Sequence, residues 1–202
     1  MKKKLYIFSI VLAFILLLFP HKLEGQEGYE PGKVQIDLGI GFSRFTTSSS
    51  LWWGANYNPY STPVFRANIE YGFHDYISGG VYFGFHRHGY RYNEFGNSWE
   101  QHNTRTSIGG RVSFHWLNFL AQELDLDVDV PQLDVYNALM LGMNFHNRRN
   151  IEPNFRNSNL NVSANFGLIL GARYAINDKF GVFVETGRGS LGWGILGASM
   201  RF

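Results

Sequence analysis

The residues with the clearest potential for chemistry are charged side chains that recur on the polar face of alternating segments. If these segments close into a barrel, the polar face turns inward and brings acidic and basic groups together. Opposite charges in a narrow, poorly hydrated space should form ion pairs and shift one another's pKa values. Such clusters can be catalytic, but structural ion-pair networks look the same, and we interpret this one as a packed polar core. Its members are Asp37, Arg66, Glu70, Arg111, Arg173, Glu185 and Arg201.

Two further sets of residues have the composition of an active site. Ser113 and His115 share a face with Glu70, which is the composition of a nucleophile, a base and an acid. A barrel interior would hide them from a lipid or peptide substrate, so a lipid-modifying enzyme is the weakest of our alternatives. His86 and His88 point the same way from one segment, and His102 and Glu94 could complete a metal site. Two histidines on one strand are weak support, and we predict neither a metal nor a cofactor.

An acidic run and the absence of cysteine limit the chemistry further. Asp125, Asp127 and Asp129 resemble the start of a calcium loop, but Val130 and Tyr136 stand where its glycine and glutamate belong. The sequence contains no cysteine, which excludes disulfides, thiolate chemistry and lipid attachment through cysteine.

Eight segments in which apolar and polar residues alternate would position these residues. Strict alternation over about ten residues means that one face meets an apolar medium and the other a polar one. In residues 33–44, for example, Val34, Ile36 and Leu38 alternate with Gln35 and Asp37. The segments are residues 33–44, 63–73, 77–90, 104–116, 133–145, 159–174, 179–186 and one that ends at residue 202.

These segments favour a transmembrane barrel over a soluble β-sandwich. Their length is close to the roughly 9–11 residues that cross a bilayer and exceeds the usual strand of about 5–6. Their polar face is rich in Gly, Ser and Asn, and long connections alternate with short ones. We therefore predict an all-β fold, an eight-stranded antiparallel up-and-down transmembrane β-barrel.

The two ends of the chain indicate the same compartment. Three lysines at residues 2–4 precede a 15-residue apolar run, which is typical of a signal peptide and too short for a transmembrane helix. We predict cleavage after Gly25, which leaves residues 26–202 as one barrel domain in the outer membrane. Cleavage removes four of 18 basic and one of 16 acidic residues, leaving 14 and 15. Such a balance offers no footprint for nucleic acid.

The connections suggest where partners could bind. An even strand number places both termini in the periplasm, so residues 45–62, 91–103, 146–158 and 187–190 are expected to be external loops. The first contains Trp52, Trp53, Tyr57 and Tyr60, which could form an interface girdle or a recognition surface. On the periplasmic side, residues 74–76 and 175–178 are short turns. Residues 117–132 are a longer insert whose start, Trp116 to Leu124, predicts a short amphipathic helix. A protein partner could use 45–62 or 117–132.

Charge is also divided between the two sides. The periplasmic side holds mainly acidic residues, among them Asp75, Glu123, Asp134 and Asp178. The external side is rich in arginine, whose planar fork matches phosphate groups such as those of lipopolysaccharide. A solvated polar rim is the alternative. The candidate lipopolysaccharide contacts are Arg87, Arg91, Arg148, Arg149 and Arg156.

Three segments carry a resemblance to known proteins: Phe180 to Gly189, Leu133 to Phe145, and the terminal SMRF. With them, the chain resembles small eight-stranded outer-membrane barrels of the OmpA/OmpX type and the outer-membrane β-barrel or porin-family proteins of Bacteroidota. The resemblance implies that the terminal Phe202 is a signal for the barrel-assembly machinery. It implies architecture and no activity. We predict a non-enzymatic structural or interaction protein; the alternatives are a narrow pore for small solutes and a lipid-modifying enzyme.

Overall fold

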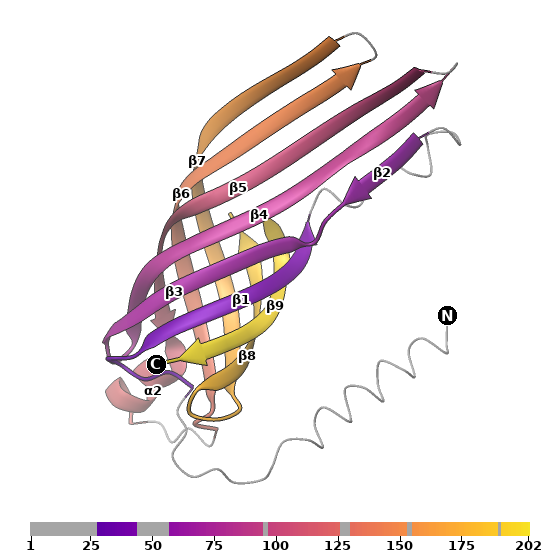
Figure 1. Ribbon diagram of the computed structural model, residues 1–202. Coiled ribbons are helices and arrows are strands. Elements are labelled where there is room, and N and C mark those ends of the chain that lie inside the picture. Colours follow the sequence, from indigo (N-terminus) through magenta and orange to yellow (C-terminus); the bar gives the residue numbers. More distant parts are fainter. Residues whose placement is uncertain (1–27, 44–56, 95–96, 126–129, 153–154, 190) are drawn as a thin grey trace, which may run out of the picture.

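The chain folds into a closed barrel in which every strand is antiparallel to its neighbours (Figure 1). The structure is a computed structural model that describes residues 28–43, 57–94, 97–125, 130–152, 155–189 and 191–202. The predicted signal peptide, Trp52, Trp53, Asp127 and Asp129 lie outside these residues. The strands are β1 (Val34–Ser43), β2 (Tyr57–Ser61), β3 (Val64–His74), β4 (Ile77–Glu94), β5 (Asn97–His115), β6 (Leu133–Glu152), β7 (Phe155–Ala175), β8 (Phe180–Arg188) and β9 (Gly192–Arg201).

The barrel has eight strands although nine segments are extended. β2 pairs only with β4, and β3 continues along the same neighbour two residues later, so β2 and β3 form one interrupted strand. The last strand pairs with the first over its whole length, from Gln35 opposite Arg201 to Ser43 opposite Gly192. This pairing closes the barrel and removes the free edges that an open sheet would expose. The predicted fold class is confirmed.

The outward face of the barrel is apolar, the reverse of a soluble protein. Leucine, isoleucine, valine and phenylalanine side chains stand exposed around its wall, as Leu38, Phe83, Leu141, Phe166 and Val184 illustrate. The interior instead buries carboxylates, guanidinium groups and hydroxyls. Exposed apolar surface on this scale needs an apolar surrounding, and the alternation in each strand supplies it on one side only.

Four strands are much longer than their apolar pattern predicts. β4, β5, β6 and β7 have 18 to 21 residues and run well beyond the ends of β1, β8 and β9 (Figure 1). The prediction of external loops over 91–103 and 146–158 is therefore wrong, because most of these residues are paired strand. Both faces of the extension are polar. The alternation of apolar and polar residues therefore ends before the strands themselves end.

The opposite end of the barrel has short turns and one helix. β3 passes to β4 through Asp75 and Tyr76, and β7 passes to β8 through residues 176–179. Helix α2 (Trp116–Glu123) lies at this end, near the C-terminus, where the amphipathic insert was predicted (Figure 1). Trp116 donates a hydrogen bond to Asn137 on β6 at 2.6 Å. Within the described residues, no helix has both the length and the apolar character that crossing a membrane requires.

Candidate functional site

The barrel interior is crossed by ion pairs between strands that are not neighbours. Arg111 on β5 lies 2.9 Å from Glu70 on β3 and 2.7 Å from Glu185 on β8. Arg66 pairs with the same Glu185. Since β5 and β8 are separated by β6 and β7, these contacts tie opposite walls together.

A second set of pairs joins β7, β6 and β1. The Arg173 guanidinium lies 2.8 Å from Asp37 and 2.8 Å from Asp134. It also stacks over the Tyr136 ring at 4.7 Å, and the Tyr136 hydroxyl donates to Glu185 at 2.7 Å. Gly171 leaves room for this ring, because a Cβ atom at residue 171 would lie only 2.4 Å from the Tyr136 ring. We call the combined set, Asp37, Arg66, Glu70, Arg111, Asp134, Arg173 and Glu185, the lumenal network.

The lumenal network differs from the predicted cluster at two positions. Asp134, which the sequence placed on the periplasmic rim, is completely buried and bridges Arg173 and His115. Arg201 instead pairs with Glu30, 2.6 Å away at the mouth of the barrel. Asp134 is the second residue of β6. Because the sequence does not fix where a strand begins, it did not show that the Asp134 side chain points into the barrel.

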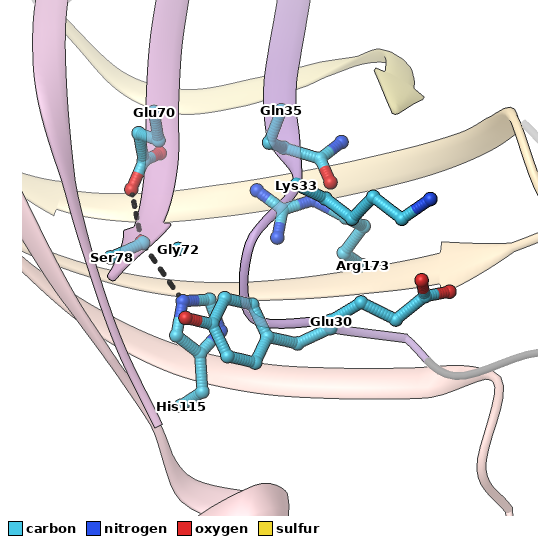
Figure 2. A pocket seen from close by; sticks show the side chains of 9 residues that line it. Glu30, Lys33, Gln35, Glu70, Gly72, Ser78, His115 and Arg173 are labelled. Carbon is cyan, nitrogen blue, oxygen red and sulfur yellow. Dashed lines mark hydrogen bonds between the residues drawn. The ribbon is translucent and has the colours of Figure 1, made fainter. Parts of the chain in front are cut away.

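Hydrogen bonds join Ser78, His115 and Asp134, and Figure 2 shows the part of this chain that runs from Glu70 through Ser78 to His115. Ser78 Oγ lies 3.0 Å from His115 Nε2, and His115 Nδ1 lies 2.8 Å from Asp134. Ser113, the serine that sequence analysis grouped with His115, instead donates to Glu70 at 2.5 Å. Ser78 also donates to Glu70, at 2.9 Å. The arrangement has the order of a catalytic triad, but all of its members are buried.

The N-terminal segment closes the barrel mouth beside this chain of hydrogen bonds. The Tyr29 ring stacks on His115 with centroids 3.6 Å apart, and its hydroxyl lies within donating distance of the carbonyl oxygens of His74 and Ile77. Burial, with the nearby carboxylate of Asp134, raises the pKa of Tyr29, so the hydroxyl stays protonated and can donate. Tyr29, Ser78 and His115 line a cavity of about 10 Å³, which has room for about one water molecule. This cavity could not admit an organic substrate.

An apolar layer fills the barrel above the lumenal network. Tyr82, Ala138, Met140 and Ile169 form one buried cluster, and Val64, Phe183 and Ile195 form another. Along β6 the inward residues pass from Asp134 and Tyr136 to Ala138 and Met140 before they become polar again. Ion pairs, apolar side chains and Tyr29 together occupy the interior, consistent with an eight-stranded barrel whose side chains fill it.

The candidate lipopolysaccharide contacts lie on both faces of the extension. Arg87, Arg91 and Arg149 continue the outward face and are exposed, whereas Arg148 continues the inward face. A 2.5 Å hydrogen bond from Arg91 lowers the pKa of Glu100. The side chain of Arg156 lies outside the described residues. The five arginines therefore do not form one surface.

The residues of the metal-site alternative do not all lie on one face of the sheet. His86 and His88 stack with ring centroids 5.2 Å apart on the inward face. His102 lies on the outward face, where it contacts Tyr60 and Glu100. Across the described residues, no group of three or more histidine, aspartate or glutamate side chains is arranged to hold a metal ion.

Phe202 ends the closing strand on the barrel wall. Its backbone N–H and carbonyl both bond to Val34, each at 2.9 Å, while 64% of the residue is exposed on the outward face. The terminal carboxyl end is thus held by the sheet, and the aromatic ring is free for contact with lipid or another protein.

Comparisons with known proteins show similarity of structure and none of sequence. No family model and no curated protein matches this chain. A structure of Ail, the attachment invasion locus protein of Yersinia pestis, with the heparin analogue sucrose octasulfate is similar with a TM-score of 0.50 and 13% identity. The match covers 86% of this chain and all of Ail.

A second solved structure is similar with a lower TM-score. The N-terminal β-barrel domain of OprF from Pseudomonas aeruginosa matches with a TM-score of 0.40 and 16% identity, over 85% of this chain and 98% of that domain. Such identities establish architecture alone. The chain has the fold of the small eight-stranded outer-membrane β-barrels.

Proposed function

We propose that the protein is a non-enzymatic component of the outer membrane whose role is interaction at its external end. The observation that carries this proposal is the packing of the interior among the described residues, where ion pairs and an apolar layer span the lumen. The long polar extension of β4 to β7 then offers a surface for contacts beyond the apolar wall. Residues 1–25 would be removed on export, and N-terminal sequencing of the mature protein tests that cleavage.

The filled interior distinguishes this role from that of a narrow pore. Purified protein in planar bilayers should show no steady conductance, because ion pairs and the apolar layer occupy the space that water would need. The Arg111→Ala variant tests whether the ion pairs close the lumen. A reproducible single-channel current from wild-type protein would reject the interaction role in favour of the pore.

The external end is proposed to contact lipopolysaccharide phosphates through Arg87, Arg91 and Arg149. Their guanidinium groups project outward just beyond the apolar wall, and arginine binds phosphate with two parallel hydrogen bonds. Replacing Arg87 and Arg149 by glutamine should weaken lipopolysaccharide binding to the folded barrel. Lys179→Gln, at the opposite end, is the matched control, and equal weakening by both changes would contradict a directed contact.

Phe202 is proposed to serve assembly and not function in the folded state. Its exposed ring lies at the end of the closing strand, where the barrel-assembly machinery would meet it. Phe202→Asp should lower the folded, heat-modifiable fraction in cells, and a wild-type folded fraction would remove this role. A protein partner bound through 45–62 or 117–132 is compatible with these proposals, and affinity purification from native membranes would identify it.

A further inference from the structure

Four aromatic side chains pack together on the outside of the barrel, at the end opposite the long strand extension. We call Tyr76, Phe114, Trp116 and Phe119 the aromatic cluster; they belong to the turn between β3 and β4, to β5 and to α2 (Figure 1). The Phe114 ring centroid lies 4.9 Å from that of Trp116, 5.5 Å from that of Tyr76 and 5.4 Å from that of Phe119. These distances are typical of packed aromatic pairs, so the rings hold α2 against the barrel.

Strand register places the aromatic cluster directly beside the apolar wall. Phe114 is opposite Ile77 on β4 and opposite Asn137 on β6. The outward pair before it on the same two strands is Val112 and Leu139, which are 50% and 49% exposed. The aromatic cluster therefore continues the outward apolar surface of β5 and β6 without a break.

Helix α2 has one side towards the barrel mouth and another side facing outward. The Asn118 side-chain amide donates to the carbonyl oxygen of Tyr29 at 3.4 Å, so this side meets the N-terminal segment. Trp116 is 41% exposed, although its indole N–H is bonded to Asn137. No residue of α2 is buried. Because the protein does not bury the apolar side chains of this helix, their apolar surroundings must come from outside the chain.

The charges around the aromatic cluster indicate which surface it fits. Residues 75–76 and 116–123 contain no lysine or arginine, whereas Asp75 and Glu123 are both exposed. Interfacial helices that bind anionic lipids carry lysine and arginine on their polar side. α2 lacks these residues and ends in a carboxylate, so an anionic surface would repel it and a zwitterionic one would not.

We propose that the aromatic cluster and α2 bind zwitterionic phospholipid, with the helix lying in the headgroup layer of the leaflet at this end of the barrel. Tryptophan and tyrosine suit that layer, since each combines an apolar ring with a polar N–H or O–H group. Lipid that covers Val112 and Leu139 would reach Phe114 and Trp116 next, which favours lipid over a protein partner. The contact would fix the depth of the barrel at one side, between β5 and β6. It is independent of the external contacts proposed above, because it lies at the opposite end.

Tryptophan fluorescence in vesicles tests where Trp116 lies. Folded protein is placed in phosphatidylcholine vesicles, with brominated phosphatidylcholine as the quencher in lipid and acrylamide as the quencher in water. The emission lost in the Trp116→Phe variant should be blue-shifted and quenched by the brominated lipid. Trp99→Phe is the matched control, because Trp99 lies in the polar extension of β5, and the emission lost in it should respond to acrylamide instead.

The absence of cysteine from the chain allows a second test on the helix itself. Leu120→Cys and Gln122→Cys each introduce one site for a nitroxide label. At 3.6 residues per turn these two positions point to different sides of α2. The label at residue 120 should be accessible to oxygen, which concentrates in lipid, and the label at residue 122 to a water-soluble nickel chelate. Heat-modifiability on gels establishes that each variant is folded.

Three results would overturn the proposal. Quenching of Trp116 by acrylamide and not by brominated lipid would place α2 in water and favour a protein partner for residues 117–132. Greater nickel access at residue 120 than at residue 122 would reverse the sides of the helix. Stronger lipid quenching of Trp116 after addition of phosphatidylglycerol would reject the zwitterionic headgroup. Loss of lipopolysaccharide binding in the Arg87 and Arg149 variants with lipid quenching of Trp116 retained would separate this contact from the proposed function.

Discussion

Two arginines on the inward face of β5 show that the same side chain serves two different environments. Arg111 is completely buried and contacts carboxylates on two other strands at 2.7 and 2.9 Å. Arg105, six residues away on the same face, is half-buried and stands between His86 and His146. Arg111 is held by carboxylates inside the barrel, whereas Arg105 lies between histidines on a half-buried face, so the fold should depend far more on Arg111 than on Arg105.

The surroundings of the two arginines extend this contrast to the two ends of the interior. The lumenal network contains four carboxylates and three guanidinium groups, and His115 contacts one of these carboxylates, that of Asp134. Tyr29 covers the network at the end of the barrel that has the short turns, and the apolar layer lies between the network and the strand extension that carries Arg105. Such a buried network resists the removal of any member, since the charge left behind has no partner. A half-buried position such as Arg105 should tolerate such a change.

The largest expected effect is therefore a difference between two equivalent substitutions on one strand. Arg111→Met should lower the free energy of unfolding by about 3–5 kcal/mol, because it leaves Glu70 and Glu185 with an uncompensated buried charge. Arg105→Met should change it by less than about 1 kcal/mol, because the Arg105 side chain is only half-buried. Urea unfolding of both variants in lipid vesicles measures the difference, and comparable losses would show that the two ends do not differ.

Substitution of Tyr29, which closes the barrel mouth over His115, should give the next largest effect. Tyr29→Ala should destabilise the barrel by about 3 kcal/mol, because it removes a buried ring and leaves a cavity over His115. Tyr29→Phe is the matched control and should cost only about 0.5–1.5 kcal/mol, the usual contribution of one hydrogen bond. The same unfolding experiment measures both. If Tyr29→Ala has no effect, the mouth is not held closed by this residue.

The sequence predicted the barrel well because one physical rule acts along its wall. Wherever lipid lies on one side and the filled interior on the other, residues alternate, as in β1 from Val34 to Phe42. The amphipathic helix at Trp116 followed from its own period for a similar reason. The strand extensions were missed because both of their faces carry polar side chains, so residues 91–94 and 97–103 show no alternation of apolar and polar residues even though they pair.

The site was less predictable than the wall because its contacts cross the barrel. The alternation of residues along each strand places Asp37 and Arg173 inside the barrel. Their pairing depends in addition on how β1 and β7 are shifted relative to each other around the closed sheet. No sequence pattern predicts that Tyr29 closes the barrel mouth, because a single residue before the first strand is not part of any alternating segment. Opposed rows such as His86, Arg105 and His146 likewise require the register of β4, β5 and β6.

The smallest expected effect is a pH dependence to which His88, on the extended part of β4, contributes. Because the pKa of His88 is lowered from 6.5 to about 4 in the folded protein, the unfolded chain binds more protons between these values. Stability should therefore fall as the pH is lowered from about 6.5 towards 4. Desolvation by burial is the largest cause of this shift, and the charges of His86, Arg105 and His146 add to it. The difference between wild type and His88→Asn isolates the contribution of the imidazole.

His88→Asn should lose less stability than wild type when the pH is lowered from about 6.5 towards 4, because it has no imidazole to protonate on unfolding. An equal loss in both proteins would show that His88 does not contribute to the acid sensitivity of the folded barrel.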